Sequence, residues 1–486
     1  MPTRQNTAHK ELWVLILTSI ASLMVALDVL VVSTALSTIR EHLHASIGEL
    51  EWTLNAYSLS FAVLLISGAA LGDRLGRRKT FAAGLGLFVA ASAACALAPN
   101  IGLLIAARTI QGGAAAVIAP LALSLLSSAI PAERRGKALG IYSSITGLAV
   151  LGGPVLGGAV TQGLAWQWIF WLNVPIGLAA IPLVMRRLDE SYGPRQRFDT
   201  RGLALITGAA FGIVWGLVRG NRIGWGSAET LIALIGGVVL TGAFVLAELR
   251  NDQPMLPMRL FKSRSFSGGS AAMFLLSCCL FGAVFFMAQF LQVTLHQGPL
   301  ASGLKLLPWT ATLFVVAPIA GALTDRIGER PLVFAGLTLQ AAGMAWIALI
   351  ARTGMPYGEL IAPLIIAGAG ISMAMPAAQN AVLAVKPADV GAASGAFTMM
   401  RQLGGVLGLA VVVAVFSGAG SYLSPATFAD GFAPAIGVAA AFSLAGALSA
   451  LVLPARRRPA PGAADAARVV ETRGASTEEV AQPIAA

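Results

Sequence analysis

The chain has 486 residues, of which 57% are apolar and only 11% are charged, and its mean hydropathy is +0.78. Soluble domains average roughly 45–50% apolar and about 25% charged residues, so a soluble, a disordered or a collagen-like chain is excluded. The net charge of +11 would favour nucleic acid as the partner of a soluble protein, but the loops of membrane proteins also collect Lys and Arg, so no nucleic-acid partner is expected. The composition predicts an all-α integral membrane protein.

Fourteen apolar segments are long enough to cross the roughly 30 Å of hydrocarbon in a bilayer. They cover residues 12–36, 52–71, 81–98, 101–126, 138–162, 168–185, 202–218, 230–247, 267–291, 305–324, 331–351, 359–384, 393–416 and 432–453. Pro99-Asn100 and the turn at 161–167 divide two charge-free runs that are too long for one helix. The first segment lacks a cleavage site of small residues, so we expect a retained span and no signal peptide.

The basic residues predict how these spans are oriented. With the N-terminus inside, the cytoplasmic segments hold 26 of the 33 Lys and Arg residues, and the outside loops hold five. This asymmetry is typical of a multi-pass protein of the cell membrane with both termini in the cytoplasm. The segment 454–486 is rich in Ala, Pro and Glu, and we expect a disordered cytoplasmic tail there.

Asp28 is the only carboxylate that lies well inside one of the predicted spans. A carboxylate at that depth costs about 2.5–3.5 kcal/mol on insertion scales, and apolar surroundings disfavour its charged form. It is therefore a candidate proton site, or a counter-charge for a cationic substrate. The alternative is a structural hydrogen bond to Ser22, Ser33 or a neighbouring helix.

A short polar loop follows the second predicted span, and a similar loop follows the tenth. The first copy contains Gly72, Asp73, Arg74, Gly76, Arg77 and Arg78, and the second contains Asp325, Arg326 and Gly328. The repeat predicts two six-helix halves, 12–186 and 251–453, with an inserted helix pair at 187–250 and a short cytoplasmic N-terminus at 1–11. We interpret the loop as a cytoplasmic gating motif, although a plain basic loop that fixes topology is the alternative.

Two arginines are embedded in predicted spans. Arg108 has Gln111 three residues later, on about the same helix face, and Asp28 is the acid available to pair with it. We expect Asp28, Arg108 and Gln111 to form the proton-coupling and substrate site. Arg401 has no such acid in its own half, so it either lines the cavity or extends its side chain to the membrane surface.

Small residues and aromatic residues mark further candidates. Gly153, Pro154, Gly157 and Gly158 would let the fifth span approach a neighbour closely, with a bend at the proline. Ordinary close packing of a membrane bundle is the alternative interpretation. Asn55, Tyr57, Phe286 and Gln289 are candidates for the lining of a cavity, although periodicity does not determine which face is inward.

The sequence does not favour an enzyme. It contains no nucleophile–base cluster, no spacing of metal ligands and no phosphate-binding loop, so we expect no cofactor and no metal. His42 and His44 could bind a metal, but we interpret two such residues on a short external segment as part of a polar loop. The three cysteines lie in apolar runs and are expected to be buried thiols.

These motifs together resemble the major facilitator superfamily, and within it the fourteen-span drug:proton antiporters. The loop at 72–80 is similar to the family signature after span two, and Arg108 with Gln111 to the span-four signature. Gly153, Pro154, Gly157 and Gly158 are similar to the signature of antiporters in span five. The resemblance implies the major facilitator fold, with two six-helix halves and two inserted helices.

The resemblance also implies a function. We expect proton-coupled export of amphipathic compounds such as drugs, antibiotics or dyes, driven by the proton gradient through alternating access. The expected partners are the lipid bilayer, the substrate and protons, and the sequence is compatible with a monomer. The alternative is a facilitator or importer of a small metabolite, which embedded Asp28 and the span-five glycines disfavour.

Overall fold

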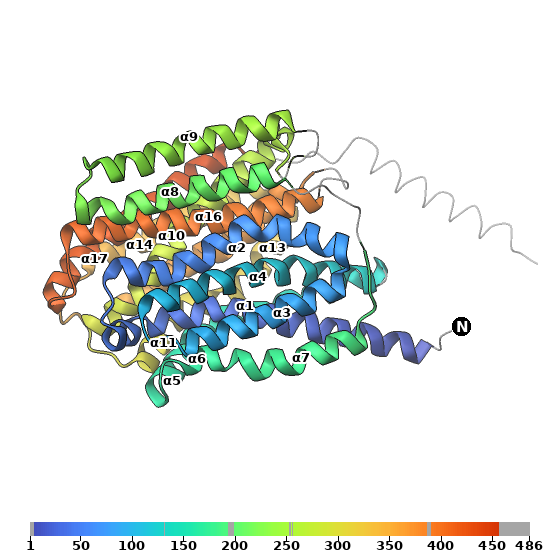
Figure 1. The fold of residues 1–486 in the computed structure, drawn as a ribbon. Helices are drawn as coiled ribbons and strands as arrows, with labels where there is room; N and C mark the ends of the chain where they lie inside the picture. Colours follow the sequence, from blue (N-terminus) through green and yellow to red (C-terminus); the bar gives the residue numbers. More distant parts are fainter. Residues whose placement is uncertain are drawn as a thin grey trace, which may run out of the picture.

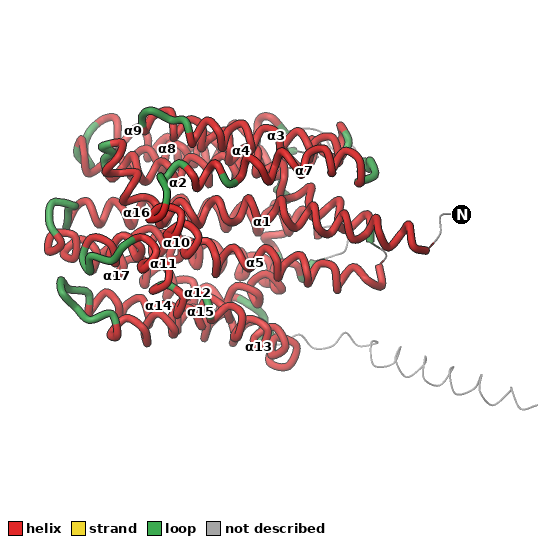
Figure 2. Tube along the Cα trace, turned by 90° about the horizontal axis from the view of Figure 1, so that it is seen from below, coloured by secondary structure: helices red, strands yellow, loops and turns green. Residues whose placement is uncertain are grey.

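A computed structural model describes residues 4–455 apart from 131, 193–198, 252–253, 255 and 386–389. Within these ranges the chain forms helices and loops and contains no strand. The long helices run along one common axis, and the loops gather at the two ends of the bundle (Figures 1 and 2). One end holds the α1–α2 connection and the other holds the N-terminus with the α2–α3 connection; we call them the α1–α2 end and the α2–α3 end.

The first half of the chain supplies seven helices. They are α1 (Arg4–Leu43), α2 (Ile47–Leu75), α3 (Arg77–Ala96), α4 (Ile101–Ala129), α5 (Ala132–Gly163), α6 (Trp168–Trp171) and α7 (Asn173–Arg187). The predicted breaks are confirmed, because the side chain of Asn100 caps α4 and residues 164–167 separate α5 from α6.

The inserted pair and the second half follow. They comprise α8 (Thr200–Ile223), α9 (Ala228–Arg250), η1 (Met258–Lys262), α10 (Arg264–Val293), α11 (Pro299–Lys305), α12 (Leu307–Thr310), α13 (Thr312–Ile327), α14 (Glu329–Ile350), α15 (Gly358–Leu383), α16 (Val390–Ala419), α17 (Pro425–Ser449) and η3 (Ala450–Val452). The span predicted at 305–324 begins earlier, at Pro299, and consists of short helices. Pro308 lies in the first turn of α12 and has no N–H to continue the hydrogen bonding of α11.

Twelve helices of the described residues are long and apolar enough to cross a membrane. The two parts of α2, bent by 52°, make a thirteenth span if they are counted together. The remaining long helix is α5, with 32 residues, where the sequence predicts the fifth span. The helices therefore follow the predicted segments, while the number of spans and their orientation stay predictions.

The duplicated loop has the same backbone geometry in both copies. Gly76 ends α2 with a φ of 106°, and Gly328 ends α13 with a φ of 86°. L-residues with a side chain rarely adopt this region, which explains why glycine stands at both turns. The backbone N–H of Gly76 donates to Gly72 O, and that of Gly328 donates to Thr324 O.

Several elements join the two halves. α2 packs against α16, α5 packs against α11, and α8 of the inserted pair contacts both α2 and α16. At the α1–α2 end, Gln292 Nε2 donates to Thr34 O at 3.1 Å, and the guanidinium of Arg40 lies 4.2 Å from the centre of the Tyr422 ring. These two polar contacts join the halves at this end.

The structure corrects one statement about the acids. α2 begins at Ile47, five residues before the predicted span, so Glu51 lies within the helix and is fully buried. Glu248, near the end of α9, is also buried. Asp28 is thus not the only carboxylate inside the bundle, because charge-free runs underestimate the lengths of the helices.

Candidate proton and substrate site

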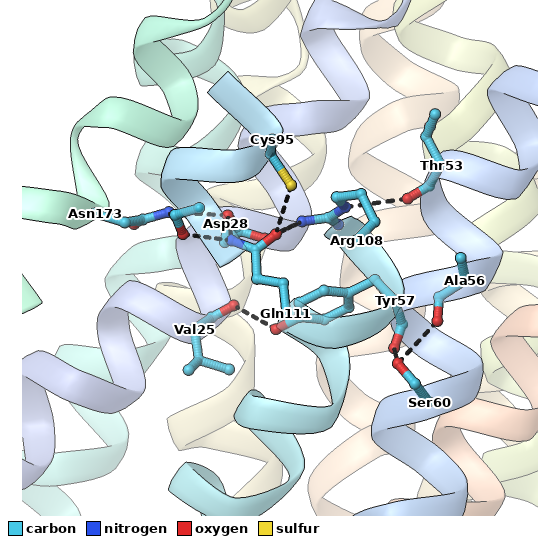
Figure 3. A network of polar contacts seen from close by, with 11 residues as sticks. Val25, Asp28, Thr53, Ala56, Tyr57, Ser60, Cys95, Arg108, Gln111 and Asn173 are labelled. Carbon is cyan, nitrogen blue, oxygen red and sulfur yellow. Dashed lines mark hydrogen bonds and ion pairs between the residues drawn. The ribbon is translucent and has the colours of Figure 1, made fainter. Parts of the chain in front are cut away.

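Asp28 of α1 and Arg108 of α4 form an ion pair in the interior of the first half, as predicted (Figure 3). Arg108 Nη1 donates to Asp28 Oδ2, and the two side chains are 0% and 1% exposed. A buried ion pair of this kind is maintained only when additional hydrogen bonds satisfy its remaining atoms. The neighbouring helices supply those bonds.

Two amides complete the coordination of the Asp28 carboxylate. Gln111 Nε2 and Asn173 Nδ2 donate to Asp28 Oδ1 at 2.8 and 2.9 Å. Gln111 Nε2 also lies 2.7 Å from Ser92 Oγ, and its Oε1 accepts a bond from Arg108 Nη1 at 2.8 Å. Both oxygens of Asp28 thus accept bonds from donors, an arrangement that fits the ionised carboxylate.

Arg108 is held on its other side by α2. Its Nε donates to the backbone oxygen of Thr53 at 3.1 Å, and its guanidinium lies 4.3 Å from the centre of the Tyr57 ring. The ring of Phe170, from α6, lies 5.8 Å away. An aromatic face attracts a desolvated cation, so Tyr57 stabilises the charge that cannot leave the guanidinium. Arg108 Nη2 is buried without a hydrogen-bond partner.

Sequence reasoning identified three members of this site and missed others. Asn173, Ser92 and the carbonyl of Thr53 were not predicted, and neither was Cys95, whose Sγ lies 3.7 Å from Gln111 Oε1. Polar residues inside apolar segments are the signal that could have found Ser92. The carbonyl of Thr53 has no signal in the sequence, since every residue carries one.

The arrangement ties five helices to one titratable group. Asp28 lies on α1, Arg108 and Gln111 on α4, Ser92 on α3, Asn173 on α7, and the Thr53 carbonyl on α2. A proton on Asp28 would remove the negative charge to which the three donors point. Binding of one proton therefore changes contacts between helices that lie far apart in the sequence.

The loop that the sequence predicts to be a cytoplasmic gating motif lies at the α2–α3 end. Asp73 Oδ1 accepts a bond from Arg77 Nε at 2.7 Å, and the backbone N–H of Arg78 donates to Glu190 Oε1 at 2.8 Å. The side chain of Arg78 also donates to Leu188 O. These contacts stay within the first half and the segment that follows it. A role in joining the two halves therefore stays a prediction for another conformation.

The predicted glycines of α5 lie between α1 and α11. A Cβ at Gly157 would lie 2.6 Å from Val31 O of α1, and one at Gly153 would lie 2.6 Å from Leu30. Gly158 faces the backbone of Pro299 in α11, while Gly303 of α11 faces Pro154 O. The glycines thus permit backbone-to-backbone packing of α5 on one helix of its own half and one of the other.

The predicted cavity candidates are buried. Asn55 Nδ2 donates to Glu51, and Phe286 packs in an aromatic cluster with Phe285, Phe416 and Phe428. Gln289 accepts a bond from the hydroxyl of Tyr422. Burial raises the pKa of Tyr422, despite the opposing effect of Arg40, so its hydroxyl keeps the proton that it donates.

Arg401 and the second copy of the loop lie in the second half of the chain. Arg401 of α16 is partly buried, and its Nε has no hydrogen-bond partner. Asp325 and Arg326 lie at the end of α13 before Gly328, where the sequence predicts them.

Cys95, Cys278 and Cys279 are buried free thiols, as expected. Within the described ranges, no group of three or more potential ligands could hold a metal ion.

Comparisons with known proteins identify the family and the fold of the chain. The family model described as Major Facilitator Superfamily matches residues 18–409 and 269–481. Among solved structures, a peptide transporter POT in complex with sulfate has a TM-score of 0.66 at 16% identity and covers 90% of this chain and 93% of its own. A D-xylose-proton symporter has a TM-score of 0.65 at 16% identity, covering 91% and 98%. At these identities the likeness concerns the fold alone.

Three curated relatives are more similar in sequence. The tetracenomycin C resistance and export protein of Streptomyces glaucescens is 33% identical, covering 87% of this chain and 79% of the relative. The cephamycin export protein CmcT of Amycolatopsis lactamdurans is 34% identical, covering 92% and 93%. The puromycin resistance protein pur8 of Streptomyces alboniger is 35% identical, covering 92% of each chain.

Proposed function

Because the chain belongs to the major facilitator superfamily, it is a multi-pass transporter of the cell membrane, and we propose that it exports amphipathic organic compounds in exchange for protons. The names of its relatives support this proposal, since they export or confer resistance to tetracenomycin C, cephamycin and puromycin. Antibiotics, other drugs or dyes are the corresponding substrates. The proton gradient supplies the energy, and no cofactor is needed.

The observation that supports the proton-coupled mechanism best is the buried network around Asp28. In the ionised state the carboxylate binds Arg108, Gln111 and Asn173 and thereby holds α1, α4 and α7 together. A proton on the carboxyl weakens the attraction to Arg108, because only the charged form makes a full ion pair. The three helices then rearrange, which couples proton binding to the alternation between two conformations.

The permanent charge of Arg108 explains why protonation of Asp28 would be followed by a rearrangement. The guanidinium stays charged at any physiological pH, so the loss of its partner leaves an uncompensated charge in the interior. Breaking one side of a buried pair costs about 3–5 kcal/mol in measured cases. A substrate that lies near Arg108, or water that enters the site, relieves that cost in the rearranged state.

The test uses inverted membrane vesicles that contain the full-length protein, with ethidium as the transported dye. Ethidium added to vesicles that hold a proton gradient should accelerate proton release by the wild type. Asp28→Asn should abolish this release and the accumulation of dye, while the protein stays in the membrane. Asp430→Asn, which changes an exposed carboxylate of α17, is the matched control and should behave like the wild type.

Wild-type coupling in Asp28→Asn would show that this network is not the proton site. Dye movement that is independent of the proton gradient in the wild type would instead favour a facilitator. The two outcomes thus separate an error about the site from an error about the class of transport.

A further inference from the structure

A second buried carboxyl lies outside the Asp28 network and has no role in it. Glu51 of α2 is 0% exposed, and Asn55, one helical turn later, is 1% exposed. Asn55 Nδ2 donates to Glu51 Oε1 at 2.8 Å. The pair lies near the start of α2, at the end of the bundle where α1 and α2 are connected.

The hydrogen bonds of this pair are incomplete by one donor. Glu51 Oε2 and Asn55 Oδ1 are both buried, and neither has a hydrogen-bond partner. Asp28 differs, because both of its oxygens accept bonds from positioned donors. Each of these two acceptors has lost its hydrogen bonds to water without gaining another, and this loss costs free energy.

Charged groups on the neighbouring helices are engaged elsewhere. α2 packs against α1, α3, α4, α8 and α16. Arg108 of α4 is bound to Asp28, and Arg40 of α1 lies over Tyr422. In the last turn of α1, His42 lies beside the ring of Trp166 and Glu41 is exposed. Arg219 of α8 is paired with Glu229, and Cys95 of α3 lies beside Gln111. α16 carries no charged residue beyond Arg401.

None of the ion pairs within the described residues includes Glu51. An ionised carboxylate at this position would therefore be a buried charge without a counter-ion. Such groups become neutral instead of remaining charged, because the protein interior does not replace the water that solvates the anion.

We infer that Glu51 carries a proton in this conformation and that Glu51 and Asn55 form a second proton-binding site of the transporter. The site binds one proton from water, which forms the Oε2–H bond of a neutral carboxylic acid. This hydrogen is the missing donor, and Asn55 Oδ1 is the bare acceptor on the residue to which Glu51 is already bonded. The protonation of Glu51 does not depend on the proposed proton-coupled transport. Only the role of this proton in the transport cycle rests on that proposal.

The two sites are in opposite states in the same conformation. The hydrogen-bond donors around Asp28 fit its ionised form, whereas the surroundings of Glu51 fit its protonated form. They are connected through α2, because Thr53 O accepts the bond from Arg108 and lies two residues from Glu51. A change of protonation at Glu51 therefore acts on the helix that carries one side of the Arg108 site.

Infrared difference spectroscopy tests the inference without measuring transport. Full-length protein in lipid is titrated with acid and base, and the carbonyl stretch of protonated carboxylic acids is followed. Glu51→Gln should remove one band of a buried, protonated acid. Asn55→Ala keeps the carboxyl but removes its amide partner, so the same band should shift to a different frequency.

Glu49→Gln is the matched control on the same helix. Glu49 belongs to the capping box of α2, a role that Gln also fills, so this change should leave the band unaltered. A band that persists in Glu51→Gln, or that does not move in Asn55→Ala, would overturn the inference. The spectrum does not depend on dye export, so failure of the proposed function would be seen separately in the Asp28→Asn vesicles.

Discussion

Arg108 shows how one residue determines the chemistry of the site. Its guanidinium is fully buried and uses Nε for the Thr53 carbonyl and Nη1 for Asp28 and Gln111, while Tyr57 covers one face. A planar group with several fixed donors can bind partners on α1, α2 and α4 at the same time. The residue therefore positions three helices around the proton site.

Arg108→Lys should impair coupling far more than expression. Lysine keeps the positive charge near Asp28, but its single ammonium cannot replace the separate donors Nε and Nη1 or stack flat on Tyr57. We expect at least a tenfold loss of substrate-driven proton release at an unchanged amount of protein in the membrane. Proton release in inverted vesicles is the measurement. Coupling equal to that of the wild type would show that the separate donors of the guanidinium are dispensable.

Arg108→Ala tests the link between the two charges. It removes the cation that favours the ionised form of Asp28, so release of the proton should need a higher pH. The pH profile of transport should therefore move toward alkaline values. A profile identical to that of the wild type would rule out the linkage, even if the overall rate fell.

Close contacts between helices decide which elements can move together. α5 approaches α1 at Gly153 and Gly157, and it approaches α11 of the other half at Gly158. α8 begins beside α9, with Asp199 as its N-cap. These contacts depend on small residues and on one cap, so single substitutions test them.

Gly157→Ala should displace α5 from α1. The added methyl would lie 2.6 Å from Val31 O, a contact that needs a backbone shift. We expect a lower melting temperature and slower transport. Gly152→Ala is the control, because its nearest atom lies at an ordinary 3.8 Å, and alanine favours a helix over glycine by about 1 kcal/mol. Equal behaviour of both variants would contradict close packing of α5.

Asp199→Ala should destabilise the inserted pair, mainly at neutral pH. Burial tends to raise the pKa of Asp199, but hydrogen bonds donated by the backbone N–H of Gly202 and the side-chain amide of Asn251 outweigh it and hold that pKa below its ordinary value. A lowered pKa stabilises the fold above the unfolded value of about 3.9, and this contribution is lost as the pH falls through the folded pKa.

The measurement is thermal unfolding in detergent at several pH values. The loss of the N-cap should cost about 1 kcal/mol at pH 7, and the difference from wild type should shrink below about pH 4. Asp199→Asn keeps a side chain that caps well but cannot ionise. Its difference from wild type should therefore be smaller at neutral pH, and a deficit as large as that of Asp199→Ala would contradict the capping role.

At the scale of the whole molecule, the halves are joined by polar contacts at one end. Gln292 binds Thr34 and Leu300 binds Gln162 at the α1–α2 end. Within the described residues, the Asp73 motif at the opposite end bonds to the first half and its following segment. This asymmetry fits a transporter that alternates between two closed ends, and we predict that the Asp73 motif contributes to closure of the α2–α3 end.

Asp73→Asn should shift the balance of conformations without abolishing substrate binding. The substitution removes the charge that orders Arg77 and leaves the loop length unchanged. Spin labels at exposed Tyr192, in the segment that follows the first half, and at exposed Leu451, in the second half, report the separation at the α2–α3 end. We expect the shorter distances to lose population in the variant.

Asp189→Asn is the control for this shift. Asp189 is 79% exposed in its pair with Lys10, and exposed pairs contribute about 0–1 kcal/mol. Its distance distribution should match that of the wild type. An unchanged distribution in Asp73→Asn, together with a collapse of substrate affinity, would show that the motif acts on binding and not on gating.

The sequence by itself determined the class of the protein, the helices and part of the site. In hydrocarbon every backbone group must be bonded within the segment, so length and apolarity alone specify where the helices run. The loop copies identified the turns at Gly76 and Gly328, which the φ angles confirm. A buried arginine needs an acid, so the pairing of Arg108 with Asp28 was predictable, and it is confirmed.

The tertiary structure alone decided which face of each helix is inward. In a soluble protein the polar face of a helix indicates its outward side, but lipid is as apolar as the protein interior, so the pattern carries little information here. The convergence of Asn173 and Ser92 on Asp28, the burial of Glu51 and the packing of Phe286 among other rings depend on the rotation and tilt of helices that are distant in the chain. Those are set by the packing of side chains between the helices, which no single segment contains.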